Sequence, residues 1–333
     1  MLYCIIEFIR KKADSVMQEK ALGQASRSKA GRSDLFKRIR KNKEIYLILS
    51  VGIVWYVVFC YLPMGGLSLA FKTYKANKGV WGSPWCGLDN FKFVFQNAQF
   101  WAAFWNTIRI SLERLLIEFP IPVLLALFLN EISHSGYKRV LQTILTFPNF
   151  LSWIVVSSVM LNLLGNNGYI NTILTSLGGN GVNFLGSPSL FRPVLYLTSI
   201  WKSAGWSAII YMAAISGVGT EQYEAATIDG ARKWQKAVYI TLPSIKPTIV
   251  VMFILAVGGI MNAGFDQIFN MGSPAVRSVS EILDTYIYRI TFESAADFSF
   301  STAVSLFKSL INFGLLIGAD RLAKKVGGSG LFA

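Results

Sequence analysis

The chain has 333 residues, of which 53% are apolar, and its formal net charge is +14. A soluble domain could not bury so much apolar surface, so the composition excludes an ordinary globular protein and indicates an all-α polytopic membrane protein. The basic residues gather at the ends of apolar runs and in the tails, as the positive-inside rule expects, so the charge does not indicate nucleic-acid binding.

The N-terminal residues 1–44 carry twelve Lys or Arg against five Asp or Glu and are predicted to form a cytoplasmic basic tail. The apolar stretch 1–9 is shorter than the roughly 20 residues of a membrane span, and no small-residue cleavage site follows it, so we expect neither a span nor a signal peptide. Leu35, Phe36 and Ile39 alternate with basic residues. That pattern fits a helix on the inner membrane surface or a solvated linker.

The apolar run 45–62 predicts the first membrane span, and Lys41 and Lys43 before it orient this span from inside to outside. The residues that follow, up to 105, are rich in Trp and Phe, which is typical of a membrane interface. Residues 45–105 are therefore predicted to hold the first transmembrane helix and an external aromatic segment.

A core transmembrane domain is predicted over residues 106–320, and its first span, 106–129, contains charged residues. These are Arg109, Glu113, Arg114 and Glu118. Charges at this depth are costly unless paired, and members of each successive pair stand four residues apart, on neighbouring helical turns. The helix is therefore expected to face protein or a water-filled cavity. Pro120 and Pro122 predict a kink, as a structural bend or as the hinge of a gate.

The third and fourth spans are predicted at 143–164 and 194–217. No Asp, Glu, Lys or Arg occurs between Val140 and Phe191, so the Gly-rich loop between these spans is expected outside. A fifth span begins at Pro247, which suits a first helical turn, and runs to about residue 263.

The sixth span is predicted at 298–319, and a basic cytoplasmic tail, 321–333, follows it. Six transmembrane helices with both termini in the cytoplasm satisfy the charges of all the loops together.

A polar loop, 218–246, joins the fourth and fifth spans on the cytoplasmic side. Thr220 is expected to cap a short helix over 221–229, which Asp229-Gly230 ends. A second helix carries Arg232, Lys233 and Lys236 on one face, and Pro243 is expected to end it. The loop is therefore a predicted helix-turn-helix.

The spacing of this loop is Glu224-Ala225-Ala226, three residues, Gly230, nine residues, then Ile240-Thr241-Leu242-Pro243. It resembles the EAA loop of binding-protein-dependent ABC importer permeases. From about Gly87 onward the chain resembles the maltose-type sugar permeases of the MetI-like fold, in particular those for oligosaccharides and polysaccharide fragments. It departs from many relatives at Val218-Gly219, where they have a proline. The alternative interpretation of the loop is an ordinary amphipathic surface hairpin.

The resemblance implies that this loop docks on a cytoplasmic ATPase and transmits its closure to the membrane spans. The small alanines would allow close approach to the ATPase, and Gly230 would allow the sharp turn. Pro243 would fix the return of the chain to the fifth span, and Glu224 would be the polar anchor. The implied coupling residues are Glu224, Ala225, Ala226, Asp229, Gly230, Leu242 and Pro243.

The resemblance also implies partners: a second permease subunit, expected to be a related chain, a cytoplasmic ABC ATPase dimer and an extracytoplasmic sugar-binding protein. The expected location is the cytoplasmic membrane of a prokaryote, in contact with lipid.

The sequence contains no phosphate-binding G-x-x-x-x-G-K-[ST] motif and no metal-ligand cluster, and Cys4, Cys60 and Cys86 have no pairing or metal spacing. We therefore expect no cofactor, no metal and no catalysis of a covalent step. The competing hypothesis is a membrane-embedded enzyme that uses intramembrane acids and bases. Its candidates are Glu113, Glu118, Lys202 and Lys308.

Sugar sites combine aromatic faces with amide and carboxylate groups, and the fourth and fifth spans offer both. The candidates for a substrate path are Trp201, Trp206, Tyr211, Asn262, Asp266 and Gln267. Each could instead serve helix packing or anchoring at the membrane interface.

The topology is tested by cysteine labelling, after the three native cysteines have been replaced. A cysteine within 171–187 should react with an impermeant thiol reagent added to intact cells, and one at 232 should not, because the first region is predicted outside and the second inside. Labelling at 232 alone would overturn the six-span topology.

Overall fold

The computed structural model describes residues 41–293 and 296–325, and this part of the chain is helical with no named strand. The predicted tail helix around Leu35 and the ends of both predicted tails lie outside the described residues. The chain divides into two compact units, 1–66 and 67–333, which are described separately. The predicted domain boundary at 105/106 falls inside the second unit and stays a prediction.

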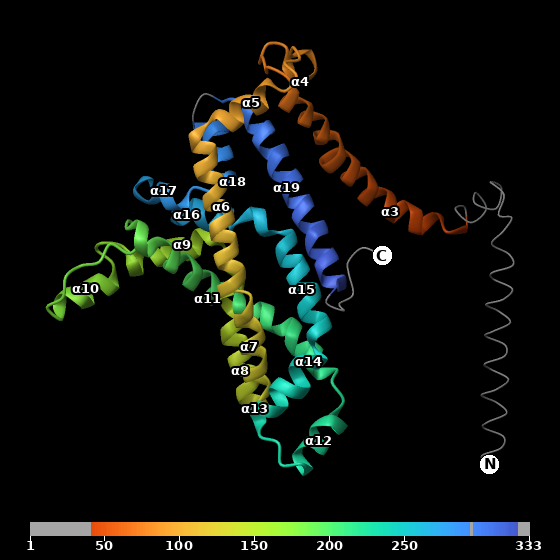
Figure 1. The fold of residues 1–333 in the computed structure, drawn as a ribbon, viewed down its shortest axis with the longest axis vertical. Helices are drawn as coiled ribbons and strands as arrows, with labels where there is room; N and C mark the ends of the chain where they lie inside the picture. The colour runs from red at the N-terminus through yellow and green to blue at the C-terminus, as the bar shows by residue number, and fades with distance from the viewer. Residues whose placement is uncertain (1–40, 294–295, 326–333) are drawn as a thin grey trace. The chain divides into compact units, whose positions relative to one another are not determined.

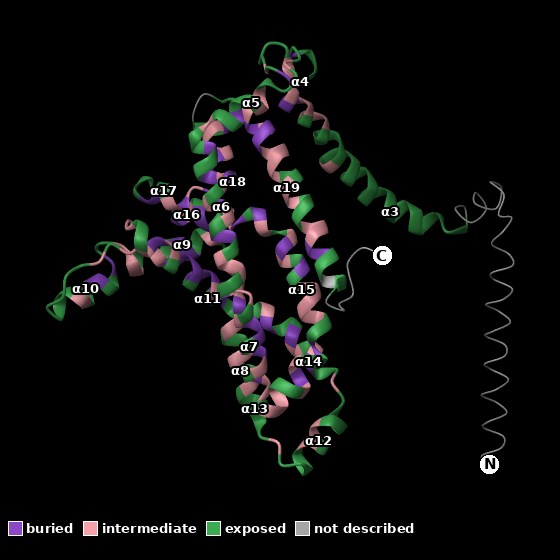
Figure 2. Cartoon of the chain, viewed as in Figure 1, coloured by how far each residue is buried: buried purple, intermediate pink, exposed green. Residues whose placement is uncertain are grey.

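The first unit is dominated by one apolar helix. It is built of α3 (Lys43–Tyr56), a π-helical stretch η2 (Val57–Tyr61) and the start of the 3-10 helix η3 (Leu62–Phe71). No residue of α3 or η2 is buried, as Figure 2 shows for α3. A run of 29 residues, Lys43–Phe71, is long and apolar enough to cross a membrane. The predicted first span is thus a helix and extends beyond its predicted end.

The external aromatic segment begins the second unit and contains α4 (Gly79–Gly82) and α5 (Asp89–Gln96). Lys72 is buried here, and its ammonium lies 4.9 Å from the ring centre of Trp85 and donates to the carbonyl of Val80 at 3.0 Å. The lysine therefore fastens the loop to the start of the segment.

The second predicted span is two helices, α6 (Ala98–Ile117) and α7 (Pro120–Asn130), separated by a turn at Glu118 and Phe119. Pro120 opens α7, where its missing N–H costs nothing. The proline break predicted for this span is confirmed.

The third predicted span, 143–164, is not one continuous helix. α8 (Ser135–Thr146) and the 3-10 turn η4 (Phe147–Phe150) precede α9 (Trp153–Leu164), and the chain bends by 100° between the two parts. Pro148 and the Ser152 cap, which accepts from the Val155 N–H at 3.3 Å, end one helix and begin the next. The short α10 (Tyr169–Ser176) follows.

The longest helix of the unit is α11 (Pro188–Ser216), which packs against α7, α8 and α17. Its approach to α8 is close, because a Cβ on Gly205 would collide with the carbonyl of Leu145. Phe191, Val194, Leu195 and Tyr196 of α11 also join a buried apolar cluster that includes Ile268 and Met271 of α16.

After α11 come α12 (Thr220–Ile228), α13 (Lys233–Lys236), the π-helical η5 (Ala237–Thr241) and α14 (Leu242–Ser244). The fifth span, predicted to reach residue 263, ends earlier: α15 covers Lys246–Gly258. Beyond it lie η6 (Ile260–Asn262), α16 (Phe265–Met271), η7 (Pro274–Val276), α17 (Arg277–Ser280), α18 (Leu283–Tyr288), η8 (Arg289–Glu293) and α19 (Phe298–Lys325).

The number of spans remains a prediction. By length and apolar content, two described helices could cross a membrane, Lys43–Phe71 and Phe298–Leu322, and the number rises to four if each of two bent helix pairs is one span. Within the second unit, α4 and α5 lie at one end of the bundle and α12 and α13 at the other (Figure 1), as the predicted topology requires.

Packing at Gly205 gives a stability prediction. Gly205→Ala should destabilise the assembled protein by about 1–3 kcal/mol, because the new methyl group would overpack the contact between α11 and α8. Gly314→Ala, in α19, is the matched control: no atom lies within 4 Å of its built Cβ, so the change should be neutral or slightly stabilising. Thermal unfolding of both purified variants measures the difference, and equal midpoints would contradict the close contact.

Candidate functional site

The polar hairpin begins with α12, a helix that has no buried residue. Gly219 is the N-cap of α12 and Thr220 is its first residue, so the predicted Thr220 cap is wrong. Glu221 in the first turn complements the helix dipole. No residue of α12 is buried, and Ile228 is 87% exposed.

The turn after α12 explains the glycine of the motif. Gly230 has φ of 76°, a left-handed conformation that favours glycine. The Ala231 N–H donates to the carbonyl of Ala226 at 2.9 Å, and the Gly230 N–H donates to that of Thr227 at 3.1 Å. These two bonds form a Schellman motif, so the helix end is satisfied without any side-chain cap.

Side-chain bonds tie the two arms of the hairpin together. The hydroxyls of Tyr223 and Thr241 lie 2.8 Å apart, and the ammonium of Lys236 donates to the Thr227 hydroxyl at 2.6 Å. Thr241 is buried, so this crosslink reaches into the membrane-facing base of the loop. The hairpin can therefore move as one body.

The residues predicted to couple to the ATPase divide between two sides of this hairpin. Glu224, Ala225, Asp229 and Gly230 are exposed, whereas Leu242 packs against a cluster of α7 and α11 residues. Within the described part of the chain, the Glu224 carboxylate makes no hydrogen bond or ion pair. It is available to an external donor. Ala226 is half-buried and Pro243 is exposed.

The sequence predicted that Pro243 ends the second helix, and this prediction is wrong. Pro243 occupies the first turn of α14, and the chain bends by 64° only after Ser244, before Lys246. The π-helical stretch η5 precedes Pro243. Because proline has no N–H, it cannot donate a hydrogen bond to a carbonyl of this preceding turn. Ile245, which is buried with α7 and α11, marks the bend.

A second candidate site is a cavity of about 370 Å³ between α6, α11 and α15. Its polar lining comes from Ser111, Arg114, Glu118, Ser203, Ser207 and Tyr211. Ser203, Ser207 and Tyr211 stand four residues apart on α11; this polar stripe is visible in the sequence, although of the three only Tyr211 was predicted as a path residue. Apolar groups of α15, among them Met252 and Leu255, form the opposite wall.

The charges at the edge of this cavity are only partly satisfied. Arg114 and Glu118 form an ion pair at 3.8 Å, with side chains 15% and 18% exposed. The hydroxyl of Ser199 donates to Glu118 at 2.8 Å, and Arg114 donates to the Gln267 amide oxygen. Nevertheless Arg114 Nε and Glu118 Oε1 are buried without a hydrogen-bond partner. The predicted pairing at four residues is confirmed, and it leaves polar capacity beside the cavity.

A break in the backbone after α15 makes room for the arginine. Ala263 and Gly264 have φ of 45° and 81°, so the chain reverses through two left-handed residues. A Cβ on Gly264 would lie 2.7 Å from an Arg114 nitrogen, so only glycine allows the guanidinium this position. Carbonyls freed by the break accept from side chains: Ser111 donates to Ile260 and Asn312 to Gly258.

The six path candidates do not gather at one place. Tyr211 lines the cavity, while Trp201, Trp206 and Asp266 are exposed. Gln267 is fully buried, and its amide group bonds Arg114, the Leu195 carbonyl and the Thr198 hydroxyl. Exposed Asn262 accepts from Lys308 at 3.1 Å.

The remaining intramembrane charges have structural partners. Lys308 pairs with Asp284 at 2.6 Å, and Lys202 donates to the Asn149 carbonyl at 2.9 Å, where the third span bends. Glu113 accepts from Arg109 at 2.8 Å and from the Tyr196 hydroxyl. The geometry therefore contains a cavity and an exposed hairpin, and the acids and bases proposed for an enzyme serve helix packing.

An exposed EAA hairpin on a broken-helix membrane bundle defines a transporter permease, and comparison with known families agrees. Residues 118–328 match the family of binding-protein-dependent transport system inner membrane components. The chain belongs to this family, has its MetI-like fold and is embedded in the membrane. These proteins are the permeases of ABC importers and are not themselves enzymes.

Named relatives narrow the comparison. Over 88% of the chain and 92% of the relative, the sequence is 42% identical to Protein LplB of Bacillus subtilis. Over 91% of the chain and 95% of the relative, the sequence is 39% identical to the polygalacturonan/rhamnogalacturonan transport system permease protein YteP of the same organism. A chain in the crystal structure of a bacterial alginate ABC transporter, in complex with alginate pentasaccharide-bound periplasmic protein, is 35% identical with a TM-score of 0.81. The match covers 89% of this chain and 99% of that one.

The two charge pairs of α6 should differ in their effect on stability. Glu118→Ala should cost about 3 kcal/mol, because it leaves a buried guanidinium unpaired. Glu113→Ala is the comparison and should cost at most about 1 kcal/mol, because the Arg109 side chain is 66% exposed. The thermal midpoint of each purified variant measures the cost, and an equal loss in both would contradict the difference in burial.

Proposed function

We propose that this chain forms part of the translocation path for a carbohydrate, an oligosaccharide or polysaccharide fragment, across the cytoplasmic membrane of a prokaryote. A separate ATPase dimer docked on the 221–243 hairpin drives the transport. A second permease, expected to be a related chain, completes the path, and an extracytoplasmic binding protein delivers the sugar. Both termini of the chain are in the cytoplasm.

The observation that carries this proposal is the exposed, crosslinked hairpin. A nine-residue helix with no buried residue gains little stability from its own chain and has its outward surface free for a partner. The residues on that surface, Glu224, Ala225 and Gly230, are those of the EAA spacing. Since Tyr223 ties α12 to Thr241 of η5, and the chain continues from η5 through α14 into α15, a displacement of α12 would be passed to the membrane helices.

The cavity beside Arg114 supports the carbohydrate assignment. Sugar hydroxyls donate and accept hydrogen bonds, and the cavity is lined by serine hydroxyls, a tyrosine and the Arg114–Glu118 ion pair. Relatives whose names specify polygalacturonan, rhamnogalacturonan and alginate point to polysaccharide fragments rather than monosaccharides. Trp201, Trp206, Asn262, Asp266 and Gln267 remain candidates for other steps of the path.

Uptake measurements test the substrate class. Cells lacking this chain should lose accumulation of labelled oligogalacturonide or alginate fragments and should regain it on complementation. A labelled neutral arabino-oligosaccharide given to the same cells shows whether acidic fragments are selected. Unchanged uptake of every fragment on deletion would contradict the carbohydrate assignment.

Variants in the hairpin test its role in coupling. Gly230→Val should store about 1–2 kcal/mol of strain at the left-handed turn and reduce uptake several-fold, whereas Gly230→Asn should be tolerated better, because Asn adopts this conformation more readily. Glu224→Ala should reduce ATPase stimulation by the binding protein, and Glu221→Ala on the same exposed helix is its control.

Insertion and expression of these variants should be normal, because the flanking membrane helices are unchanged. If Gly230→Val and Glu224→Ala insert normally and transport at the parental rate, the hairpin is not the coupling element.

A further inference from the structure

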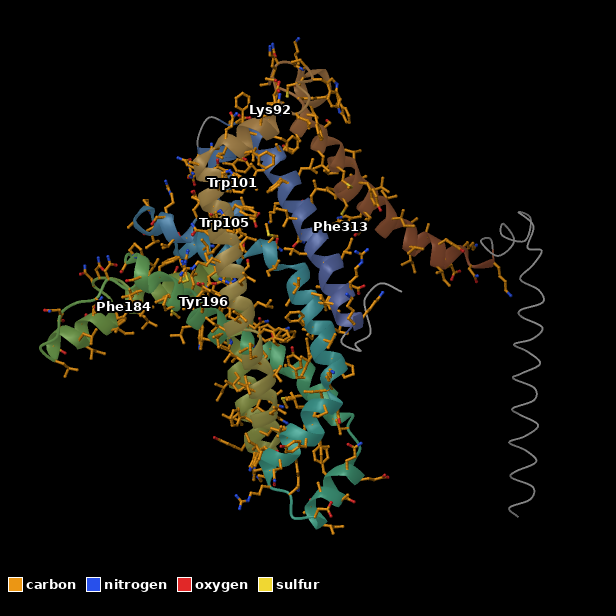
Figure 3. The ribbon with its side chains drawn as sticks, viewed as in Figure 1. Lys92, Trp101, Trp105, Phe184, Tyr196 and Phe313 are labelled. Atoms are coloured by element: carbon orange, nitrogen blue, oxygen red, sulfur yellow. The ribbon has the colours of Figure 1, made fainter. Side chains whose placement is uncertain are left out.

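A second and larger cleft, of about 740 Å³, lies between α6 and the first half of α11. It is separate from the cavity beside Arg114 and shares none of its lining residues. Its walls are formed by Arg109, Glu113, Ile117, Arg192, Leu197 and Ile200, among others. Tyr196 lies where the two helices meet (Figure 3), and its hydroxyl donates to Glu113 across the junction.

The charges of this cleft do not balance. Glu113 is its one carboxylate, and both carboxylate oxygens are already engaged, one by Arg109 Nε at 2.8 Å and the other by Tyr196. Arg192 donates only to neutral acceptors, the Val279 carbonyl at 3.0 Å and the Asn106 amide oxygen at 2.8 Å. The guanidinium groups of Arg109 and Arg192 face the single carboxylate of Glu113, so the cleft has a net charge of one positive unit.

Some guanidinium donors in the cleft are also unused. Among the described residues, the two terminal nitrogens of Arg109 and Nη1 of Arg192 make no hydrogen bond. Arginine presents these donors in a planar fork that suits phosphate and carboxylate oxygens. The open end of the cleft therefore fits an anion.

The other end of the cleft is apolar. Ile117 follows Arg109 by eight residues on α6, and Ile200 follows Arg192 by eight residues on α11, so each isoleucine lies about 12 Å further along its helix. Leu197, between Arg192 and Ile200, is 69% exposed. The cleft thus changes from charged to apolar along its length, and a small soluble anion would leave its apolar part uncovered.

We propose that this cleft binds an anionic phospholipid. Its phosphate lies between Arg109 and Arg192, and an acyl chain follows Ile117, Leu197 and Ile200. A zwitterionic lipid carries no net negative charge to offset the surplus positive charge, and an acidic sugar would not match the apolar end. With the predicted topology, α11 enters the membrane from outside, so the headgroup belongs to the outer leaflet.

Lipid titration tests the site in the purified importer complex, stripped of lipid in detergent. Dioleoyl phosphatidylglycerol should bind to the wild-type complex more tightly than dioleoyl phosphatidylcholine, as measured by native mass spectrometry. The double variant Arg109→Gln and Arg192→Gln should lower phosphatidylglycerol affinity about tenfold and leave phosphatidylcholine binding unchanged. Lys92→Gln is the control, because it removes an exposed, carboxylate-paired cation from α5 and should change neither.

A photo-crosslinking phosphatidylglycerol supplies a test that needs no variant. In the wild-type complex its adducts should map to peptides containing 109–117 and 188–200. Adducts only elsewhere would overturn the proposal and leave the cleft to the partner permease. Equal phosphatidylglycerol binding by the double variant would also overturn it, as would displacement of the lipid by an equimolar galacturonate trimer, which would make the cleft a sugar-acid site.

Discussion

A membrane interior supplies no hydrogen bonds, so every backbone group that a broken helix frees has to be satisfied by another part of the protein. This constraint decides where the polar side chains of the second unit lie. Lys202 donates to Asn149 where the third predicted span bends, and Asn312 donates to Gly258 where α15 ends. Lys202, a candidate base for an enzyme, is thereby explained as the partner of a helix break.

The same breaks create the space in which a transporter can work. Two left-handed residues after α15 turn the chain away, and the missing side chain of Gly264 admits the Arg114 guanidinium. The charge is stabilised by Glu118 and Gln267, but the pairing is incomplete, and the unsatisfied atoms border a cavity. Tighter apolar packing at this place would fill the cavity and remove the polar wall that Arg114 and Glu118 form.

The hairpin at one end of the bundle differs from the broken helices, because it satisfies its backbone groups without side chains from distant parts of the chain. It satisfies its own backbone through the Schellman turn at Gly230 and crosslinks its arms through Tyr223 and Thr241, so it needs no cover from the chain. Its exposed surface stays available to a partner, and its buried base stays attached to α15. A stiff element joined in this way can transmit a displacement as a body rather than absorb it.

The sequence by itself determined the membrane class, the hairpin and the ion pairs of α6, because each rests on local features: apolar content, the EAA spacing and charges four residues apart. Only the tertiary structure decided what distant residues do. Gln267 bonds Arg114, 153 positions away in the chain, and the third predicted span contains a bend of 100°, beside which Lys202 donates to the Asn149 carbonyl. Hydropathy and periodicity report the medium around a segment and its local helix, whereas partners brought together by folding leave no regular spacing in the chain.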